Sequence, residues 1–474
     1  MPTETFTADF AANRSLMLEK LRVNRSFDLI SRTVQMENHQ AQLYFIDGMV
    51  KDDTLNKILE LLMKVTPEQI EGLDSARAFA DRIVPYGETN VVDNVNDFLT
   101  FVLSGVVGML LEGCSEAILI DVRTYPARPV MEPENDRVLR GAREGFVETL
   151  VSNTAMLRRR LRDPQLTMEL IQVGERSHTD VVLCYLADRA DQKLLERLRT
   201  KLRSVKINTL TMGLESLIEC TVPGQWWNPF PRARSTERPD CAAAGVAEGQ
   251  VILLMDNCPA GLILPTGVFD FLQDTNDFCF LPVTGIYLRW LRLLVSILTT
   301  VLTPAWYFCM KNPDILPPFL NFIKVHEPIA MPILAQFLII ELVVGALKLA
   351  SLNTPSALSN SFSVIGALVL GDFAIRAELM VPETVLFMAF VTVANFAQPS
   401  YELGYALTFA RVLLLIACAL FNLWGLLAAG VLILVAISCT KPLSGNCYWY
   451  PLLPFNGKAL KSLFLRRPIM WENS

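Results

Sequence analysis

The segment QFLIIELVVGALKLA, residues 336–350, determines the class of this protein. It is a nearly continuous apolar run, interrupted by Glu341 and Lys348, and such a run is typical of a helix that crosses a bilayer. An ionisable group near the middle of a span costs about 2.5–3.5 kcal/mol or more, so it usually faces protein or water. Glu341 is therefore not expected to face lipid. Lys348, two turns further on, can extend to the cytoplasmic interface as a boundary anchor.

The composition of the whole chain indicates a soluble half and a membrane half. The 474 residues are 52% hydrophobic and 19% charged, with a mean hydropathy of +0.35, which is more apolar than soluble proteins usually are. Charged residues are concentrated before residue 280 or so, and apolar runs follow. Spans are expected near 286–310, 328–350, 357–375 and 382–398, with one long apolar tract over 404–438.

Basic residues orient the predicted spans. Arg289 and Arg292 mark the start of the first span as cytoplasmic, and the tail carries Lys441, Lys458, Lys461, Arg466 and Arg467. If both ends of the membrane half lie in the cytoplasm, the chain must cross the bilayer an even number of times. Five apolar tracts are visible, however. Either the long tract supplies two crossings, with a bend at residues 422–425, or another tract is re-entrant. The N-terminus has no secretory signal, so the first half is expected in the cytoplasm.

The predicted fold is an α/β cytoplasmic region of two small units followed by an all-α multi-pass transmembrane bundle. The expected parts are an N-terminal extension (1–40), a first α/β unit (41–125), a linker and long amphipathic helix (126–165), a second α/β unit (166–283), a transmembrane helical domain (284–440) and a cytoplasmic tail (441–474).

Apolar spacing predicts the elements of the two units. In the first, strands at 42–50 and 117–122 flank a helix behind an Asp cap, with Leu55, Ile58, Leu59 and Leu62 on one face. NDFLTFVLSGVVGMLLEG, between them, is interpreted as a buried core helix rather than a bilayer span. In the second, strands at 180–187, 249–256 and 261–266 accompany a helix at 191–205, with a hairpin turn at 257–260.

Two charged segments leave alternatives open. In RGAREGFVETLVSNTAMLRRRLRDP, the expected long amphipathic helix, the arginines Arg158, Arg159, Arg160 and Arg162 favour a solvated or inter-subunit face over a phosphate or lipid-headgroup site. Around Pro239, a first-turn proline, the residues Thr236, Glu237, Arg238 and Asp240 form either a cap with local ion pairs or a subunit or ligand contact.

Motifs for catalysis, metals and nucleic acids are not found in the sequence. There is no phosphate-binding glycine loop, nucleophile elbow or HExxH motif, so an enzyme is not expected. The ten cysteines never form CxxC, and His39, His178 and His326 lie far apart, so neither a metal site nor a cofactor is expected. The net charge of −6 gives no nucleic-acid signal.

Several stretches together resemble the A-subunit family of GerA-type spore germinant receptors: YFIDGMV, RGAREGFVETLVSNTAMLRRRLRDP, NPFPRARSTERPD with EGQVILLMD, QFLIIELVVGALKLA and QPSYELGYALTFARVLLL. LESLIE, WWNPFPRARSTERPD and PSYELGYALTFARVLLL look most similar to one sporulation-stage member, associated with dipicolinate-release genes. The resemblance implies a cytoplasmic domain on a bundle in the spore inner membrane. It also implies a homo-oligomer, a pentameric ring, that conducts monovalent cations beside other germination membrane proteins.

The candidate pathway residues are Glu341 in the second span and, in the small-residue third span, Ser359, Ser363, Gly366, Gly371 and Asp372, where close packing competes with a polar pore wall. Arg143, Glu144 and Glu402 join the four residues before and after Pro239 as contact candidates. Gly345 stands where many relatives have a second acid, and Lys348 where Arg is common.

A ring of subunits would convert Glu341 into a ring of carboxylates, which favours cations. The favoured function is therefore an oligomeric ion channel or channel-forming receptor of germination. The alternatives are a secondary transporter, for which no repeated halves are visible, and a scaffold in which Glu341 pairs with a partner helix and no current flows.

Overall fold

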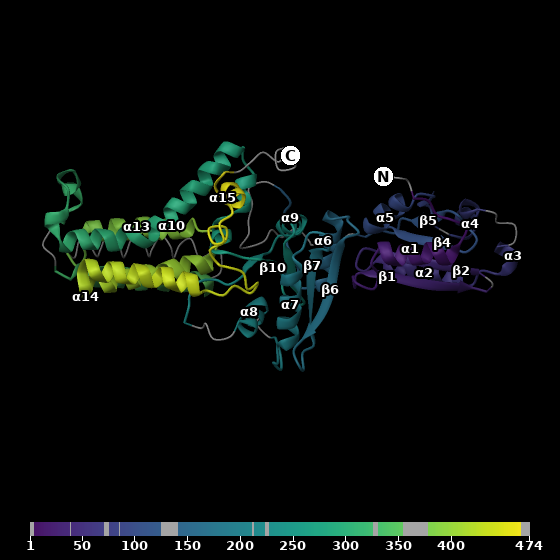
Figure 1. The fold of residues 1–474 in the computed structure, drawn as a ribbon, viewed down its shortest axis with the longest axis horizontal. Helices are drawn as coiled ribbons and strands as arrows, with labels where there is room; N and C mark the ends of the chain where they lie inside the picture. The colour runs from purple at the N-terminus through teal and green to yellow at the C-terminus, as the bar shows by residue number, and fades with distance from the viewer. Residues whose placement is uncertain are drawn as a thin grey trace. The chain divides into compact units, whose positions relative to one another are not determined.

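A computed structural model describes residues 4–37, 39–70, 75–84, 86–124, 141–210, 213–222, 227–325, 330–353 and 378–465, and the chain divides into two compact units (Figure 1). We call Met1–Pro223, Ala233–Thr266 and Leu443–Gly445 the sheet unit. Gly224–Arg232, Gly267–Pro442 and Asn446–Ser474 form the helical unit. The predicted fold class, an α/β region followed by an all-α membrane region, is confirmed.

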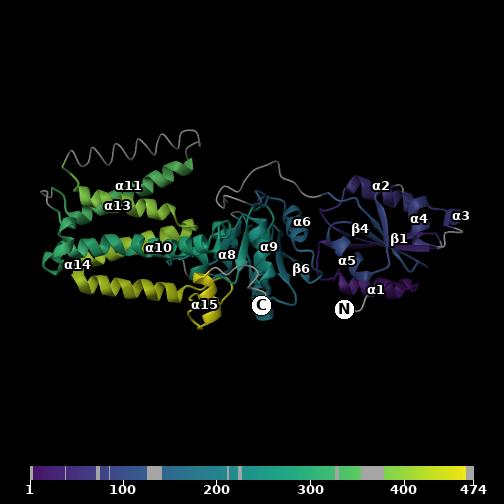
Figure 2. The ribbon, with the colours of Figure 1, turned by 90° about the horizontal axis from the view of Figure 1, so that it is seen from above.

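The first sheet has the strand order β1-β2-β4-β5-β3, and all neighbours are antiparallel. Its strands are β1 (Leu29–Met36), β2 (His39–Ile46), β3 (Thr89–Val92), β4 (Val107–Leu111) and β5 (Ala117–Ile120). One face is covered by α2 (Asp52–Met63) and α4 (Ala76–Ile83), the other by α1 (Phe10–Lys20) and α5 (Val95–Leu103); a short α3 (Pro67–Ile70) follows α2. Figure 2 shows α2 and α4 on one side and α1 on the other.

The second sheet has the order β6-β7-β9-β10-β8, again all antiparallel. Its strands are β6 (Leu166–Val173), β7 (Thr179–Leu186), β8 (Arg234–Thr236), β9 (Val251–Met255) and β10 (Gly261–Leu264). One face is covered by α7 (Gln192–Ser204) and α8 (Leu214–Thr221), the other by α6 (Leu150–Arg160) and α9 (Pro239–Ala247).

The two sheets are copies of one topology. Apart from α3, each follows the series helix, two strands, two helices, strand, helix, two strands, and each places its third strand at the far edge. The sequence predicted two units, but it did not predict that they share a strand order. Both are three-layer sandwiches because each sheet buries apolar side chains on both faces and needs helices on both.

Core packing follows the apolar spacing. In α2, Leu55, Ile58, Leu59 and Leu62 are all buried, which confirms the predicted helix face. Every residue of β4 and of β9 is buried, as expected for a strand covered on both faces. Gly108 in β4 is required by packing, since a Cβ there would lie 2.4 Å from the Phe98 ring.

The interpretation of residues 96–113 as one core helix is wrong. Helix α5 ends at Leu103, Gly105 turns the chain with φ +98, and β4 then pairs with β2 and β5. The segment is buried, as predicted, but a glycine in the left-handed region ends the helix and the remaining apolar residues form a central strand. Residues 1–40, expected as an extension, contribute α1 and β1 to the first sandwich.

The long amphipathic helix is also shorter than predicted. Only α6, 11 residues, is helical, because Asn153 closes the preceding loop: its amide donates to the Val147 carbonyl at 2.6 Å and its carbonyl accepts from the Val147 N–H at 2.8 Å. The arginine run does not lie on one solvated face. Arg158 is fully buried, whereas Arg159 and Arg160 pair with Glu144 at 3.3 and 2.7 Å.

The helical unit contains three helices long and apolar enough to cross a membrane, Pro282–Lys311, Ile333–Ala350 and Tyr401–Cys439, among the residues described. Its elements are α10 (Pro282–Lys311), α11 (Ile333–Asn353), α13 (Pro382–Phe396), α14 (Tyr401–Cys439), α15 (Gly457–Phe464), and the 3-10 helices η1 (Val268–Leu272), η2 (Thr275–Phe278), η3 (Pro313–Ile315) and η4 (Pro318–Ile323). The span predicted at 357–375 lies outside the described residues.

Helix α14 folds back on itself at Asn422, whose φ of 53 and ψ of −132 are not helical. Leu403 and Ala406 of its first half share an apolar cluster with Ile433 and Ile437 of its second half, and Figure 2 shows the yellow second half as a separate ribbon. A straight helix would separate these residues by roughly 45 Å. The bend predicted at residues 422–425 is confirmed, and the long tract supplies two antiparallel helices.

Candidate functional site

The predicted Glu341 forms a bidentate ion pair with Arg411 inside the helical unit. From the first half of α14, Arg411 Nη2 donates to Glu341 Oε1 at 2.8 Å and Oε2 at 2.7 Å, and its Nε donates to Oε2 at 3.2 Å. Arg411 Nη1 donates to the Thr299 carbonyl of α10 at 2.9 Å. The site thus joins α10, α11 and α14. The Arg411 side chain is 1% exposed, whereas Glu341 retains 16%.

A second cation lies on the same helix as Glu341. Lys348 Nζ is 5.8 Å from the Phe396 ring centroid and 5.4 Å from the Tyr405 ring centroid, a cation–π geometry. The described part of the site therefore combines Arg411 and Lys348 with the carboxylate of Glu341. Arg411 binds the Glu341 carboxylate through two guanidinium nitrogens. The single ammonium nitrogen of Lys348 does not offer that geometry.

Several polar side chains, which we call the polar seam, lie on the apolar helices α10, α13 and α14 and next to α13: Ser296, Thr303, Thr384, Asn395, Gln398 and Thr408. Ser296 Oγ donates to Gln398 Oε1 at 3.0 Å, and Asn395 Nδ2 donates to Thr408 Oγ1 at 3.2 Å. Thr408 Oγ1 also accepts from Arg411 Nη2 at 3.4 Å, which connects the polar seam to the ion pair.

Four buried atoms of the polar seam have no hydrogen-bond partner among the residues described: Thr303 Oγ1, Thr384 Oγ1, Asn395 Oδ1 and Gln398 Nε2. An unsatisfied polar group in a bilayer interior costs several kcal/mol. These atoms therefore require water or polar groups from outside the described residues. Chemically, the polar seam can form hydrogen bonds to water molecules.

The two arginines that mark the start of the first span are anchored to one buried acid. Arg292 donates to both Asp277 oxygens, at 3.1 and 2.9 Å, and Arg289 Nε donates to Asp277 Oδ2 at 3.3 Å. Asp277 is fully buried in η2. Their positive charge, predicted to orient the span, is thus largely used to fasten α10 to the segment before it.

The other predicted pathway residues, Ser359, Ser363, Gly366, Gly371 and Asp372, lie outside the described residues. Glu402 lies exposed in the first turn of α14, where a carboxylate interacts favourably with the positive end of the helix.

The contact candidates of the sheet unit have local partners. Thr236 Oγ1 accepts from the Arg238 N–H at 3.2 Å, and the buried Arg238 forms an ion pair with Asp240 at 2.5 Å and donates to the Ala142 carbonyl at 2.9 Å. The Glu237 carbonyl accepts from the Phe146 N–H at 2.8 Å. Pro239 is the first residue of α9, as predicted. Arg143 is exposed, and Glu144 pairs with the arginines of α6.

The sequence reasoning missed Arg411 and the polar seam. Arg411 had a usable signal, because it is a lone arginine inside ALTFARVLLLIACAL, and an intramembrane charge needs a partner. The polar seam had a weaker signal, since Thr, Asn and Gln are common at helix ends. Within the described ranges, no group of three His, Cys, Asp or Glu side chains could hold a metal ion.

Comparison with known proteins gives consistent results. The family model described as Bacillus/Clostridium GerA spore germination protein matches residues 17–474. Stage V sporulation protein AF of Bacillus subtilis (strain 168) is 35% identical over 456 residues, which cover 96% of this chain and 92% of that protein. Spore germination protein KA of the same organism is 27% identical over 458 residues, which cover 95% and 83%. The resemblance to the family and to a sporulation-stage member is confirmed.

A solved structure is similar to the sheet-containing part. The crystal structure of the N-terminal domain of the A subunit of the Bacillus megaterium spore germinant receptor GerK3 covers 56% of this chain and 97% of its own, with 25% identity and a TM-score of 0.42.

Proposed function

This chain belongs to the GerA family of spore germination proteins, and from that premise we propose that it is an oligomeric channel subunit that conducts monovalent cations during germination. In this proposal its helices lie in the spore inner membrane and its sheet unit lies in the cytoplasm. Several copies, in a ring of five, surround the pathway, and other germination membrane proteins act as partners.

The observation that carries the proposal is the unsatisfied polar seam beside a partly exposed Glu341. Within the described residues of a single copy, buried Thr, Asn and Gln atoms have no partners, in a region that lipid would otherwise surround. A water-filled path between copies would supply the missing hydrogen bonds and would also receive the Glu341 carboxylate.

Glu341 contributes a charge that Arg411 holds in place. Because the pair is bidentate and Arg411 is buried, the carboxylate is fixed at one position and its net field is weakened. Cation selectivity then depends on how much of the carboxylate faces the pathway, which its 16% exposure allows. Other acids of the ring, with Asp372 as a candidate, would add to it.

Two variants test the role of the charge. Glu341→Gln leaves Arg411 uncompensated, so it changes both charge and stability. Glu341→Gln combined with Arg411→Gln removes both charges and leaves two amides that can still bond to each other. Currents are measured across a bilayer containing purified full-length protein at asymmetric KCl, alone and with co-expressed germination membrane proteins. Glu378→Gln, an exposed acid outside the apolar segments, is the matched control.

We expect the double variant to assemble normally and to lose cation selectivity, whereas Glu378→Gln keeps it. A double variant with wild-type selectivity would mean that the pair only joins helices. Absence of current in every preparation, with oligomers present, would favour the scaffold, and saturable uptake of a solute without ohmic current would favour the transporter.

A further inference from the structure

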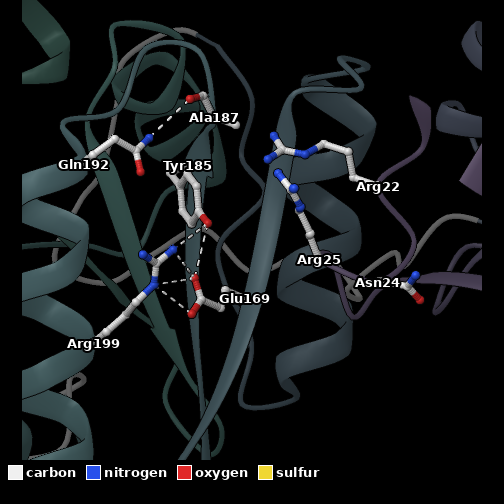
Figure 3. A pocket seen from close by; sticks show the side chains of 8 residues that line it. All are labelled: Arg22, Asn24, Arg25, Glu169, Tyr185, Ala187, Gln192 and Arg199. Carbon is white, nitrogen blue, oxygen red and sulfur yellow. Dashed lines mark hydrogen bonds and ion pairs between the residues drawn. The ribbon is translucent and has the colours of Figure 1, made fainter. Parts of the chain in front are cut away.

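A polar cavity of about 530 Å³ lies inside the sheet unit, where the loop after α1 meets β6, β7 and the start of α7 (Figure 3). It is unrelated to the polar seam, which belongs to the helical unit. Its charged side chains are Arg22 and Arg25 from the loop, Glu169 from β6 and Arg199 from α7, and Tyr185 and Gln192 also line it.

One wall of the cavity is already neutralised. Arg199 Nε donates to both Glu169 oxygens at 2.9 and 3.0 Å, and Nη2 donates to Oε2 at 2.8 Å and to the Tyr185 hydroxyl at 3.1 Å. Tyr185 donates to Glu169 Oε2 at 3.2 Å. Burial and the adjacent Glu169 raise the pKa of Tyr185, so its hydroxyl stays protonated and remains a donor at neutral pH. Both oxygens of the Glu169 carboxylate therefore already accept hydrogen bonds, and Arg199 neutralises its charge.

The opposite wall carries two positive charges that no carboxylate of the described residues neutralises. Among the described residues, the Arg22 guanidinium contacts only a neutral group, Gln165 Oε1 at 3.3 Å from Nη1, and the Arg25 guanidinium has no hydrogen-bond or ion-pair partner. Figure 3 shows the two guanidinium groups side by side, on the side of the cavity facing Tyr185 and Gln192. Two like charges held together are unfavourable unless an anion or water lies between them.

The loop that carries both arginines is held rigidly. The Arg25 N–H donates to the Arg22 carbonyl at 2.8 Å, which closes a turn. Immediately after it, the Phe27 N–H donates to the Met168 carbonyl at 3.0 Å, and Ser26 Oγ accepts from the Met168 N–H at 2.9 Å. Met168 precedes Glu169 in β6, so the loop is fixed against the strand that forms the other wall. Such a site is organised before a ligand arrives.

We propose that this cavity binds a small phosphate-type oxyanion, through Arg22 and Arg25, with Gln192 as a neutral donor nearby. Guanidinium groups bind phosphate through paired N–H donors, and two of them match an anion with a charge near −2. The shared chemistry fits free phosphate and a small phosphate ester. This inference goes beyond the proposed conduction, which neither requires nor excludes a ligand in the sheet unit.

The test uses the full-length protein in detergent micelles at low ionic strength, because added salt screens exposed charges. Heats of binding are measured for inorganic phosphate and, in a second arm, for glycerol 3-phosphate. The variants are Arg25→Gln, Arg22→Gln and the double variant. Arg32→Gln, an exposed arginine on β1 outside the cavity, is the matched control, and unfolding temperatures without phosphate confirm that all variants are folded.

We expect one phosphate per chain for the wild type, affinity weakened about tenfold by each single variant, and no measurable binding by the double variant. Arg32→Gln should bind like the wild type. Tighter binding of glycerol 3-phosphate identifies an ester as the ligand, and equal or weaker binding identifies free phosphate. No heat with the wild type, or an equal loss in Arg32→Gln, overturns the proposal. Because no current is read, its failure is independent of channel activity.

Discussion

At the scale of single residues, a buried ion pair between Arg158 and Asp28 joins the two sandwiches of the sheet unit. Arg158 Nε and Nη2 donate to the two Asp28 oxygens at 3.0 and 3.2 Å, and neither side chain is more than 1% exposed. Asp28→Ala leaves a buried guanidinium without its counter-charge, so we expect the free energy of unfolding to fall by about 3–5 kcal/mol. Urea unfolding of the full-length protein, followed by circular dichroism, measures the change.

A surface pair provides the control for this prediction. Arg77 and Asp81 are one turn apart on α4, 3.2 Å from each other, with 58% and 54% of their side chains exposed. Asp81→Ala should lower the free energy of unfolding by no more than about 0.5 kcal/mol, because water already screens the pair. Equal losses in the two variants would show that Asp28 has no special role in joining the sandwiches.

The pair of Asp121 and Arg123 predicts how the stability of the sheet unit changes at low pH. Its hydrogen bonds with the Arg123 guanidinium hold the pKa of its carboxyl below the usual value. Because the folded-state pKa is the lower one, the stabilisation is complete above the unfolded value of about 3.9 and is lost as pH falls through the folded value. Asp121→Asn should be less stable than the wild type at neutral pH and should approach it below about pH 3, in thermal unfolding at each pH. A constant difference across that range would contradict the assignment.

At the scale of elements, the turn inside α14 depends on one residue in an unusual conformation. Asn422 and Asn312 exchange side-chain hydrogen bonds at 2.7 and 2.8 Å, and Lys311 Nζ donates to the Ala419 carbonyl at 2.6 Å, at the end of the first half. A φ of 53 with a ψ of −132 favours glycine, so the Asn422 backbone is strained and its amide bonds to Asn312 offset that strain.

Substitutions at Asn422 separate these two contributions. Asn422→Gly loses the amide bonds but also relieves the backbone strain, so we expect a net loss of about 1 kcal/mol or less. Asn422→Val loses the bonds and is also strained, so the loss should be larger by roughly 1–2 kcal/mol. Unfolding temperatures of the purified protein in detergent rank the variants. In an Asn312→Ala background, Asn422→Gly should have little further effect, and a full additional loss would show that the two amides act independently.

The elements that could be predicted are those whose signal is local. The α2 face repeats every three or four residues, and the hairpin of β9 and β10 has its turn residues between two apolar runs. Residues 96–113 could not be divided correctly because helix α5 and strand β4 are both continuously apolar, and only Gly105 marks the boundary. Arg158 could not be assigned from helix periodicity, because its partner lies 130 residues earlier.

The same limit applies to the candidate site. Glu341 was recognisable because an acid interrupts an apolar run, but its partner Arg411 is 70 residues away and belongs to another span. Pairing at that distance depends on how the helices pack, which the local pattern does not contain. The polar seam is similar, since each of its residues is ordinary in its own helix and only their assembly leaves atoms unsatisfied.

At the scale of the whole molecule, contacts within the helical unit determine which ends of the helices lie together. At one end, the Val268 N–H before α10 donates to the Tyr448 carbonyl after α14 at 2.9 Å. At the other, Asn312 after α10 meets Asn422 at the α14 turn, at 2.7 Å. The chain therefore leaves the bundle at the end where it entered, which predicts an even number of crossings.

This arrangement predicts the sidedness of four exposed positions. Leu281 and Phe455 belong to the end where the chain enters and leaves, whereas Phe319 and Trp424 belong to the end with the α14 turn; their exposed fractions are 77%, 74%, 75% and 78%. Single cysteines at these positions, in a chain whose ten native cysteines are replaced, are labelled in sealed vesicles by a membrane-impermeant maleimide. We expect positions 281 and 455 to react together from one side and 319 and 424 from the other. If 281 and 455 react from opposite sides, the fold-back at Asn422 does not exist in the membrane. Each half of α14 has roughly 17–21 residues, which reaches 26–31 Å, about the thickness of the hydrocarbon core, so both halves can span it.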